Sequence, residues 1–185
     1  MKFWKINSYA KINLSLNIVG KLKNKLHKIE SLVSFLDLKD EIYLKKINSK
    51  KHKIYFKGKF SNNIKKKNTI TELLRLIDKK KLLNDKKFEI KIIKNIPQKS
   101  GMGGGSMNVA SLMSFFIKKN FFQIKKKELI ELNNSIGSDV ILGMNKKNTV
   151  LSSNGSITRY NYNLNYYVIV AKPDFGCSTK VIYSK

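Results

Sequence analysis

Apolar and polar residues alternate along several short stretches of the chain, and a period of two residues predicts β-strands. In residues 11–19 the apolar positions are Ile12, Leu14, Leu16 and Ile18, with polar residues between them. Similar patterns predict strands over residues 3–8, 41–47, 52–56 and 88–93, a hairpin over residues 149–160, and a buried strand over residues 166–171. The predicted sheet therefore draws strands from both halves of the chain.

Three other stretches have a helical period instead. Residues 106–116 place apolar side chains at i, i+3, i+4 and i+7, which predicts a helix with Ser106 as its N-cap. Residues 69–77 predict a second helix, opened by a capping box that joins Thr69 to the glutamate three residues later. Residues 125–134 predict a third helix.

Glycines gather between the predicted strand 88–93 and the helix that follows it. Four of the ten glycines of the chain lie within residues 101–105. Glycine allows left-handed turns and lets a ligand approach bare N–H groups, and a helix N-terminus attracts anions. A phosphate cradle is the favoured interpretation, and a surface loop without a ligand is the alternative. The common P-loop is excluded because no Lys-Ser or Lys-Thr pair follows the last glycine.

The net charge of +26 is the most unusual feature of the composition. Lysine supplies nearly all of it, since Arg75 and Arg159 are the only arginines. Nucleic-acid surfaces use arginine for bidentate contacts, so the lysine excess is typical of AT-rich coding and of solvated faces. A basic α+β module that binds RNA or another polyanion stays open as the alternative function. His52 lies between lysines and is expected to be solvated.

Cysteine content and hydropathy limit the other function classes. Cys177 is the single cysteine, which excludes an intramolecular disulfide and a cysteine zinc cluster. No run approaches the ~20 apolar residues of a membrane span, and the first residues lead into a strand pattern rather than a signal peptide. We expect a soluble, cytoplasmic protein with no metal bound by a protein cluster, no membrane contact and no specific nucleic-acid partner.

The glycine-rich segment, Pro-x-x-x-Gly-Met-Gly-Gly-Gly-Ser-x-Asn-x-Ala, resembles the phosphate loop of the GHMP kinase family. Met107 departs from that pattern, in which a second hydroxyl residue is usual. The resemblance implies ATP binding by Pro97, Gln98, Lys99, Ser100, Gly101, Met102, Gly103, Gly104, Gly105, Ser106 and Met107.

Two further motifs supply the implied catalytic residues. Residues 9–14, Tyr-Ala-Lys-Ile-Asn-Leu, resemble the opening motif of the family, in which the lysine acts beside the catalytic aspartate. Residues 137–140, Gly-Ser-Asp-Val, resemble the segment that carries this aspartate, the general base. Lys11 and Asp139 are therefore the implied catalytic pair. A helix N-cap is the alternative role for Asp139, and the two roles are compatible.

The resemblance also implies four residues that contact the substrate. Asn13 shares its parity with Lys11, so both side chains point to the same face of the strand. His27 matches a histidine that reads the cytosine base, although Lys-Leu replaces the preceding Gly-Tyr pair; a structural or solvated histidine is the alternative. Thr179 and Tyr183 match pocket-lining residues near the end of the sequence.

The fold and activity follow as expectations from the same resemblance. It implies an α+β GHMP-kinase N-terminal domain over residues 1–162, a mixed sheet with helices packed on one side. Residues 163–185 would form the first strand and substrate loop of a truncated C-terminal subdomain. The implied reaction is ATP- and Mg²⁺-dependent phosphorylation of a small molecule, the 2-hydroxyl of 4-diphosphocytidyl-2-C-methyl-D-erythritol, in non-mevalonate isoprenoid synthesis. Because family members are longer, the chain by itself is expected to be slow or an inactive remnant.

Overall fold

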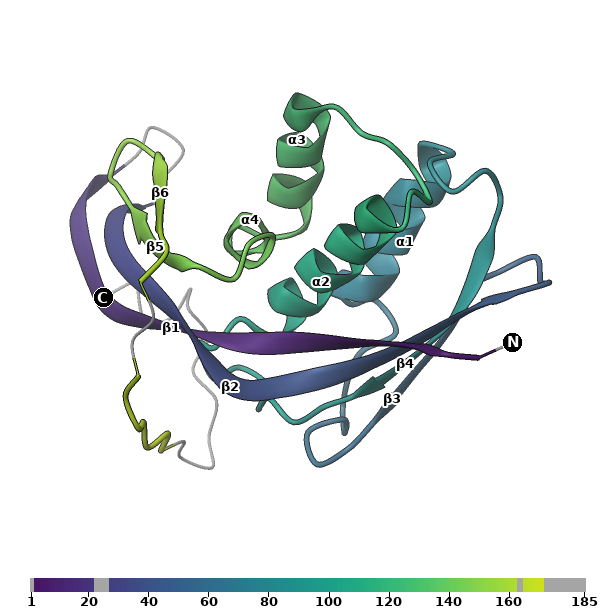
Figure 1. The fold of residues 1–185 in the computed structure, drawn as a ribbon, viewed down its shortest axis with the longest axis horizontal. Coiled ribbons are helices and arrows are strands. Elements are labelled where there is room, and N and C mark those ends of the chain that lie inside the picture. Colours follow the sequence, from purple (N-terminus) through teal and green to yellow (C-terminus); the bar gives the residue numbers. More distant parts are fainter. Residues whose placement is uncertain (1, 22–26, 163–164, 172–185) are drawn as a thin grey trace.

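A computed structural model describes residues 2–21, 27–162 and 165–171 of the chain (Figure 1). Strands and helices both occur along it, as expected for an α+β protein. In chain order the elements are β1 (Trp4–Lys21), β2 (His27–Ile47), β3 (Lys53–Lys57), α1 (Thr69–Lys79), β4 (Lys87–Ile93), α2 (Gly104–Lys118), α3 (Lys126–Ile136), α4 (Val140–Gly143), β5 (Asn148–Leu151) and β6 (Ile157–Tyr160).

The strands form one mixed sheet. Its order is β3-β4-β2-β5-β6, and β1 pairs antiparallel with β2. Strands β3 and β4 are parallel, whereas the other pairs are antiparallel. The strands predicted over 3–8 and 11–19 are one continuous strand, because the break between them is a register shift between Tyr9 and Lys11. A bulge of this kind bends a strand without ending it.

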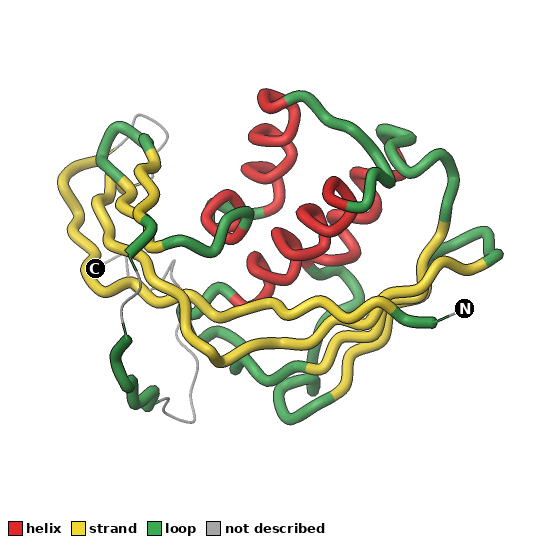
Figure 2. The backbone as a smooth tube through the Cα atoms, viewed as in Figure 1, coloured by secondary structure: helices red, strands yellow, loops and turns green. Residues whose placement is uncertain are grey.

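The helices cover one face of the sheet, and the opposite face carries no helix among the described residues (Figure 2). The predicted apolar stripes of α1 and α2 both face the sheet. Each fully buried aliphatic or aromatic side chain contributes roughly 1.5–3 kcal/mol. The central core residues are Ile42, Leu44, Phe88, Ile90 and Ile92 from the sheet, with Ile70, Leu73, Ile77, Val109, Leu112, Met113 and Phe116 from the helices.

Both predicted helix caps are wrong by one to three residues. Helix α1 is capped by Asn68, whose side chain accepts from the N–H groups of Ile70 and Thr71. Helix α2 begins after Gly103, which adopts the left-handed conformation with φ +66°, and not after Ser106. A glycine can start a helix by its backbone alone, so Ser106 lies inside the first turn.

Two other expectations are also wrong. The ring of His52 is buried rather than solvated: its Nδ1 accepts from the Phe88 N–H at 3.1 Å and its Nε2 lies 3.3 Å from Asp78 Oδ1. Residues 166–171 form no strand, and Tyr167 and Ile169 are almost fully exposed. Among the described residues no strand pairs with this segment; it lines a surface pocket beside Ile12 and Leu14 instead.

Candidate active site

The predicted phosphate loop connects β4 to α2, as the sequence indicates. Three of its residues have left-handed backbones: Lys99 with φ +53°, Gly101 with φ +75° and Gly103 with φ +66°. Helix α2 has no side-chain cap, and its first main-chain hydrogen bond joins the Met107 N–H to the Gly103 carbonyl at 2.8 Å. The N–H groups that precede this bond, those of residues 104–106, are the orphan donors of the first turn. They are the groups that an anion would contact.

Most of the longer side chains of the loop form hydrogen bonds or packing contacts within the protein. Gln98 Nε2 donates to the carbonyls of Phe60 and Asn62 at 2.8 and 2.7 Å, and Ser100 Oγ donates to the Pro97 carbonyl at 2.8 Å. Met102 is buried with Ala10 and Ile96, and Met107 is buried against Gly143. Pro97 is half-buried and Lys99 is exposed. The loop therefore presents mainly its backbone.

Lys11 and Asp139 meet beside this loop, although 128 residues separate them in the sequence. Lys11 Nζ lies 3.2 Å from Asp139 Oδ2 and donates to Asn13 Oδ1 at 2.7 Å. Asn13 Nδ2 donates in turn to Ser31 Oγ at 2.6 Å. The Lys11 side chain is 7% exposed and that of Asp139 is 34% exposed. A carboxylate open to solvent thus stands next to a buried, oriented cation.

Gly103 is the point at which the loop touches this pair. The Lys11 N–H donates to the Met102 carbonyl at 3.1 Å, which fixes strand β1 to the loop. A β-carbon at Gly103 would lie 3.1 Å from Lys11 Cγ, 3.3 Å from Lys11 Cε and 3.6 Å from Asp139 Oδ2. A side chain at this position would strain the backbone and push Lys11 aside, so glycine allows the close approach. The orphan N–H groups, the cation and the carboxylate consequently share one site.

A buried carboxylate, that of Asp40, holds both ends of the loop, although no motif of the sequence points to it. Asp40 Oδ1 accepts from the N–H groups of Asn95 and Ile96 at 2.8 and 2.9 Å. Its Oδ2 accepts from Asn108 Nδ2 in α2 at 3.0 Å and from the Lys94 ammonium. Asp40 is fully buried. Because buried charges need such partners, this network fixes the entrance of the loop relative to α2.

The residues implied for substrate contact are only partly described. Asn13 lies in the catalytic cluster through its bonds to Lys11 and Ser31. His27 begins strand β2 opposite Lys21, but its side chain lies outside the described residues, as do Thr179 and Tyr183. Their roles stay predictions.

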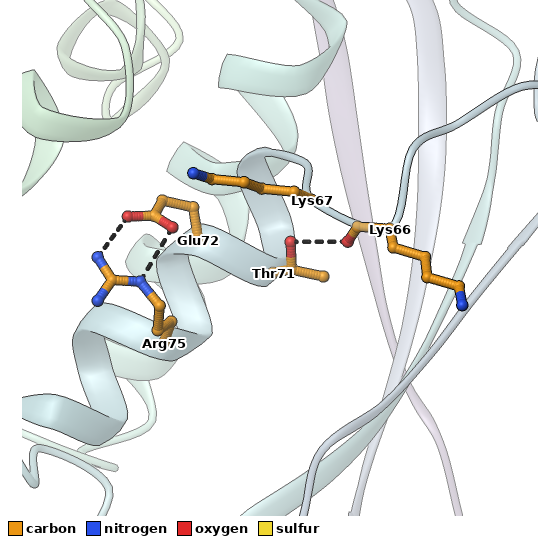
Figure 3. Close-up of a pocket in the computed structure, with 5 residues that line it drawn as sticks. All are labelled: Lys66, Lys67, Thr71, Glu72 and Arg75. Carbon is orange, nitrogen blue, oxygen red and sulfur yellow. Dashed lines mark hydrogen bonds and ion pairs between the residues drawn. The ribbon is translucent and has the colours of Figure 1, made fainter.

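The catalytic cluster is separate from the surface pockets. A pocket of about 420 Å³ on α1 shares no residue with the cluster (Figure 3). A pocket of about 620 Å³ includes Ile12 and Leu14, whose parity on β1 is opposite to that of Lys11. The smaller pocket is lined by Lys66, Lys67, Thr71, Glu72 and Arg75.

Comparison with known proteins identifies the family. The family described as GHMP kinases N terminal domain matches residues 68–151, which include the loop, α2 and Asp139. A 4-diphosphocytidyl-2-C-methyl-D-erythritol kinase of Pelagibacter ubique (strain HTCC1062) is 59% identical over 185 residues, 100% of this chain. The chain belongs to the GHMP kinase family. The expected family and α+β fold class are confirmed.

Other GHMP kinases are similar at greater distance. The 4-diphosphocytidyl-2-C-methyl-D-erythritol kinase of Clostridium tetani (strain Massachusetts / E88) is 34% identical over 98% of this chain and 64% of its own length. A crystal structure of 4-(cytidine 5'-diphospho)-2C-methyl-D-erythritol kinase has the same fold, with a TM-score of 0.66 at 17% identity, over 85% of this chain and 55% of that one. The chain spans about two thirds of the curated relatives it matches, 66% of the Pelagibacter protein.

The oxygen atoms near the loop of this GHMP kinase determine how a metal ion could be bound. No group of three or more His, Cys, Asp and Glu side chains gathers within residues 2–21, 27–162 and 165–171. Mg²⁺ is commonly held by one or two protein oxygens together with substrate phosphates, so it does not need such a cluster. Asp139 supplies a partly exposed carboxylate. Ser106 supplies a hydroxyl oxygen that lies close to Gly137, two residues before Asp139, since a β-carbon at Gly137 would lie 3.2 Å from it. This donor set fits a metal that arrives with a nucleotide.

Over the described ranges, no helix combines the length and apolar character needed to cross a bilayer.

Proposed function

We propose that this protein is a small-molecule kinase that transfers the γ-phosphoryl group of ATP to the 2-hydroxyl of 4-diphosphocytidyl-2-C-methyl-D-erythritol. The observation that carries the proposal is the convergence at Gly103 of a helix N-terminus, the Lys11 ammonium and the Asp139 carboxylate. The 59% identity to the Pelagibacter kinase supports this particular substrate. The substrate is accordingly a small molecule rather than a nucleic acid.

Phosphoryl transfer requires little covalent chemistry from the protein. The protein has to align the two substrates, stabilise the developing charge and accept one proton. The N–H groups of residues 104–106 would hold the phosphates of ATP, since they are aligned with the α2 dipole. Mg²⁺, when bound with ATP, would neutralise charge on the phosphate oxygens, and Asp139 and Ser106 would supply protein oxygens to hold it. Lys11 would stabilise negative charge on the transferred group, and its bond to Asn13 keeps its ammonium oriented.

Asp139 would act as the general base. In the reaction the substrate oxygen forms a bond to the γ-phosphorus while the bond from that phosphorus to the β,γ-bridging oxygen breaks. ADP leaves with the electron pair, and the hydroxyl proton passes to the Asp139 carboxylate. General-base catalysis contributes ~10²–10⁴-fold to such rates. The exposure of this carboxylate beside a buried cation leaves one side of it open to a hydroxyl group.

The remaining assignments follow from the family. Asn13, His27, Thr179 and Tyr183 would contact the substrate. Residues 1–162 would form the ATP-binding domain, and residues 163–185 would begin the next subdomain. These assignments rest on the matching motifs of the sequence.

The test uses the 185-residue chain and a fusion of it to the part of the Pelagibacter kinase that lies outside the aligned region. Asp139→Asn keeps size and hydrogen-bonding reach but cannot take the proton. In the fusion we expect turnover to fall by ~10²–10⁴-fold while Mg·ATP affinity stays near that of the unmodified protein. Asp85→Asn, which changes an exposed carboxylate in a turn, is the matched control. Turnover at the unmodified level in Asp139→Asn would refute the assignment.

A further inference from the structure

Arg159 reaches from β6 to the short helix that follows Asp139. Its Nη2 donates to the Ile141 carbonyl at 2.8 Å, and its Nη1 donates to the carbonyls of Leu142 and Asn145 at 3.2 and 2.7 Å. The last turn of an α-helix has orphan carbonyls, and a cation there is also favoured by the helix dipole. Arg159 therefore caps the C-terminal end of α4.

The use of arginine at this position is informative, because lysine supplies nearly all other positive charge. Only two of the 38 basic residues are arginines. The other, Arg75, forms a two-nitrogen fork with Glu72, at 3.0 and 2.6 Å. A planar guanidinium serves acceptors from two separate nitrogens, whereas a lysine ammonium donates from one atom. The two Nη atoms of Arg159 donate to three carbonyls, which a single lysine nitrogen could not do with the same geometry.

Helix α4 depends on such contacts because it is only four residues long. Isolated helices of this length are not stable. On its α2 side, Gly143 packs so closely that a β-carbon would lie 2.7 Å from Ala110 Cβ and 2.8 Å from Met107 Sδ. Arg159 provides the polar anchor from β6. The buried Met107 side chain belongs to the α2 surface that packs against Gly143.

The turn that Arg159 holds is also the turn that carries the proposed base. The Asp139 carbonyl accepts from the N–H groups of Leu142 and Gly143 at 3.1 and 3.4 Å. The Asp139 side chain makes no capping bond within α4, so its direction is set by the backbone and by Lys11. A shift of α4 would therefore move the carboxylate away from its 3.2 Å contact with Lys11 Nζ.

We propose that Arg159 is a positioning residue that fixes α4 and thereby aims the Asp139 carboxylate at the reacting hydroxyl. The proposal rests on the proposed function, in which Asp139 is the general base. Arg159 does not touch the substrate in this scheme. It acts through the three carbonyls that it holds.

The test compares Arg159→Lys with Arg75→Lys in the fusion protein. Arg159→Lys keeps the charge and removes the fork, and a misplacement of about 1 Å at a catalytic group can lower turnover by ~10²-fold. We expect kcat to fall by that order while KM for ATP changes little, because none of the hydrogen bonds that Arg159 forms with the described residues reaches the phosphate loop. Hydrogen exchange of the Leu142 and Gly143 amides should accelerate by about tenfold or more. Arg75→Lys should change neither quantity.

A double-mutant cycle separates positioning from a general loss of stability. If Arg159 acts through Asp139, Arg159→Lys in the Asp139→Asn background causes no further fall in kcat. An equal fall in both backgrounds, or unchanged exchange at Leu142 and Gly143, would overturn the positioning role. Unmodified turnover in Asp139→Asn alone would count against the proposed function instead, so the two failures are distinguishable.

Discussion

Gly101 and Gly103 make a matched pair of positions for testing the geometry of the loop. Both have left-handed backbones, with φ +75° and +66°. An added β-carbon at Gly101 meets nothing within 4 Å, whereas at Gly103 it meets Lys11 at 3.1 and 3.3 Å. Alanine at either position therefore introduces similar backbone strain, and only alanine at Gly103 also displaces Lys11.

The magnitudes follow from these contacts. A left-handed backbone costs an alanine roughly 1–2 kcal/mol, so both variants should lose about that much free energy of unfolding. The Lys11 side chain is only 7% exposed, so crowding also disturbs its bonds to Asn13 and Asp139. A hydrogen bond to a charged group is worth roughly 1.5–3 kcal/mol. Gly103→Ala should therefore lose about 3 kcal/mol or more in total.

Two assays check this prediction. Urea unfolding of the 185-residue chain gives the difference in stability between Gly103→Ala and Gly101→Ala. Turnover of the fusion gives the difference in catalysis, which should be at least about tenfold, because 1.4 kcal/mol of lost alignment corresponds to that factor. Equal losses of stability and of turnover in the two variants would refute the claim that Gly103 sets the position of Lys11.

Two further predictions concern buried polar groups outside the reacting atoms. Asp40→Asn leaves the Lys94 ammonium buried without its charged partner and should reduce the free energy of unfolding by ~3–5 kcal/mol in urea titration; a loss below 1 kcal/mol would contradict this reasoning. For His52, burial is the largest influence and lowers the ring pKa below its usual range, while Asp78 opposes this shift. The unfolded state then binds the proton more readily, so stability should fall as pH drops below about 6.5, and His52→Gln should flatten that fall. An unchanged slope in His52→Gln would exclude His52 as its cause.

The sequence predicts the elements around the loop because their signals are local. The alternation before residue 94, the dense glycines and the helical period after Gly105 each occupy a few neighbouring positions. The shared parity of Lys11 and Asn13 predicts that both lie on one face of the strand, and their side chains are hydrogen-bonded. The predicted start of α2 at Ser106 is wrong because the usual N-cap preference depends on side chains, whereas Gly103 begins the helix through its backbone conformation.

Beyond the pair of Lys11 and Asp139, which the family motifs imply, contacts between distant segments are the part that the sequence does not reveal. Asp40 bonds to residues 54–68 positions away, and Arg159 bonds to carbonyls 14–18 positions away. Each leaves a faint signal: Asp40 has the parity of Ile42 and Leu44 on the core face of β2, and Arg159 is a rare arginine in a lysine-rich chain. Neither feature of the sequence indicates which residues the side chain contacts.

The segment 166–171 illustrates the opposite error. Its apolar, β-branched composition favours a strand, but a strand forms only against a neighbouring edge. No strand of the described structure pairs with it. Composition thus predicts which conformation a segment prefers, while the presence of a partner decides whether it is adopted.

Titration of the 185-residue chain with Mg·ATP tests the central claim, a phosphate cradle at the start of α2, most directly. We predict saturable binding of one nucleotide per chain at about 150 mM salt, lost in Gly103→Val because a β-branched side chain there crowds Lys11 and the loop. A lysine-rich polyanion-binding module would behave differently, with affinity that falls steeply with salt. Binding that is indifferent to Gly103→Val and follows that salt dependence would contradict the cradle.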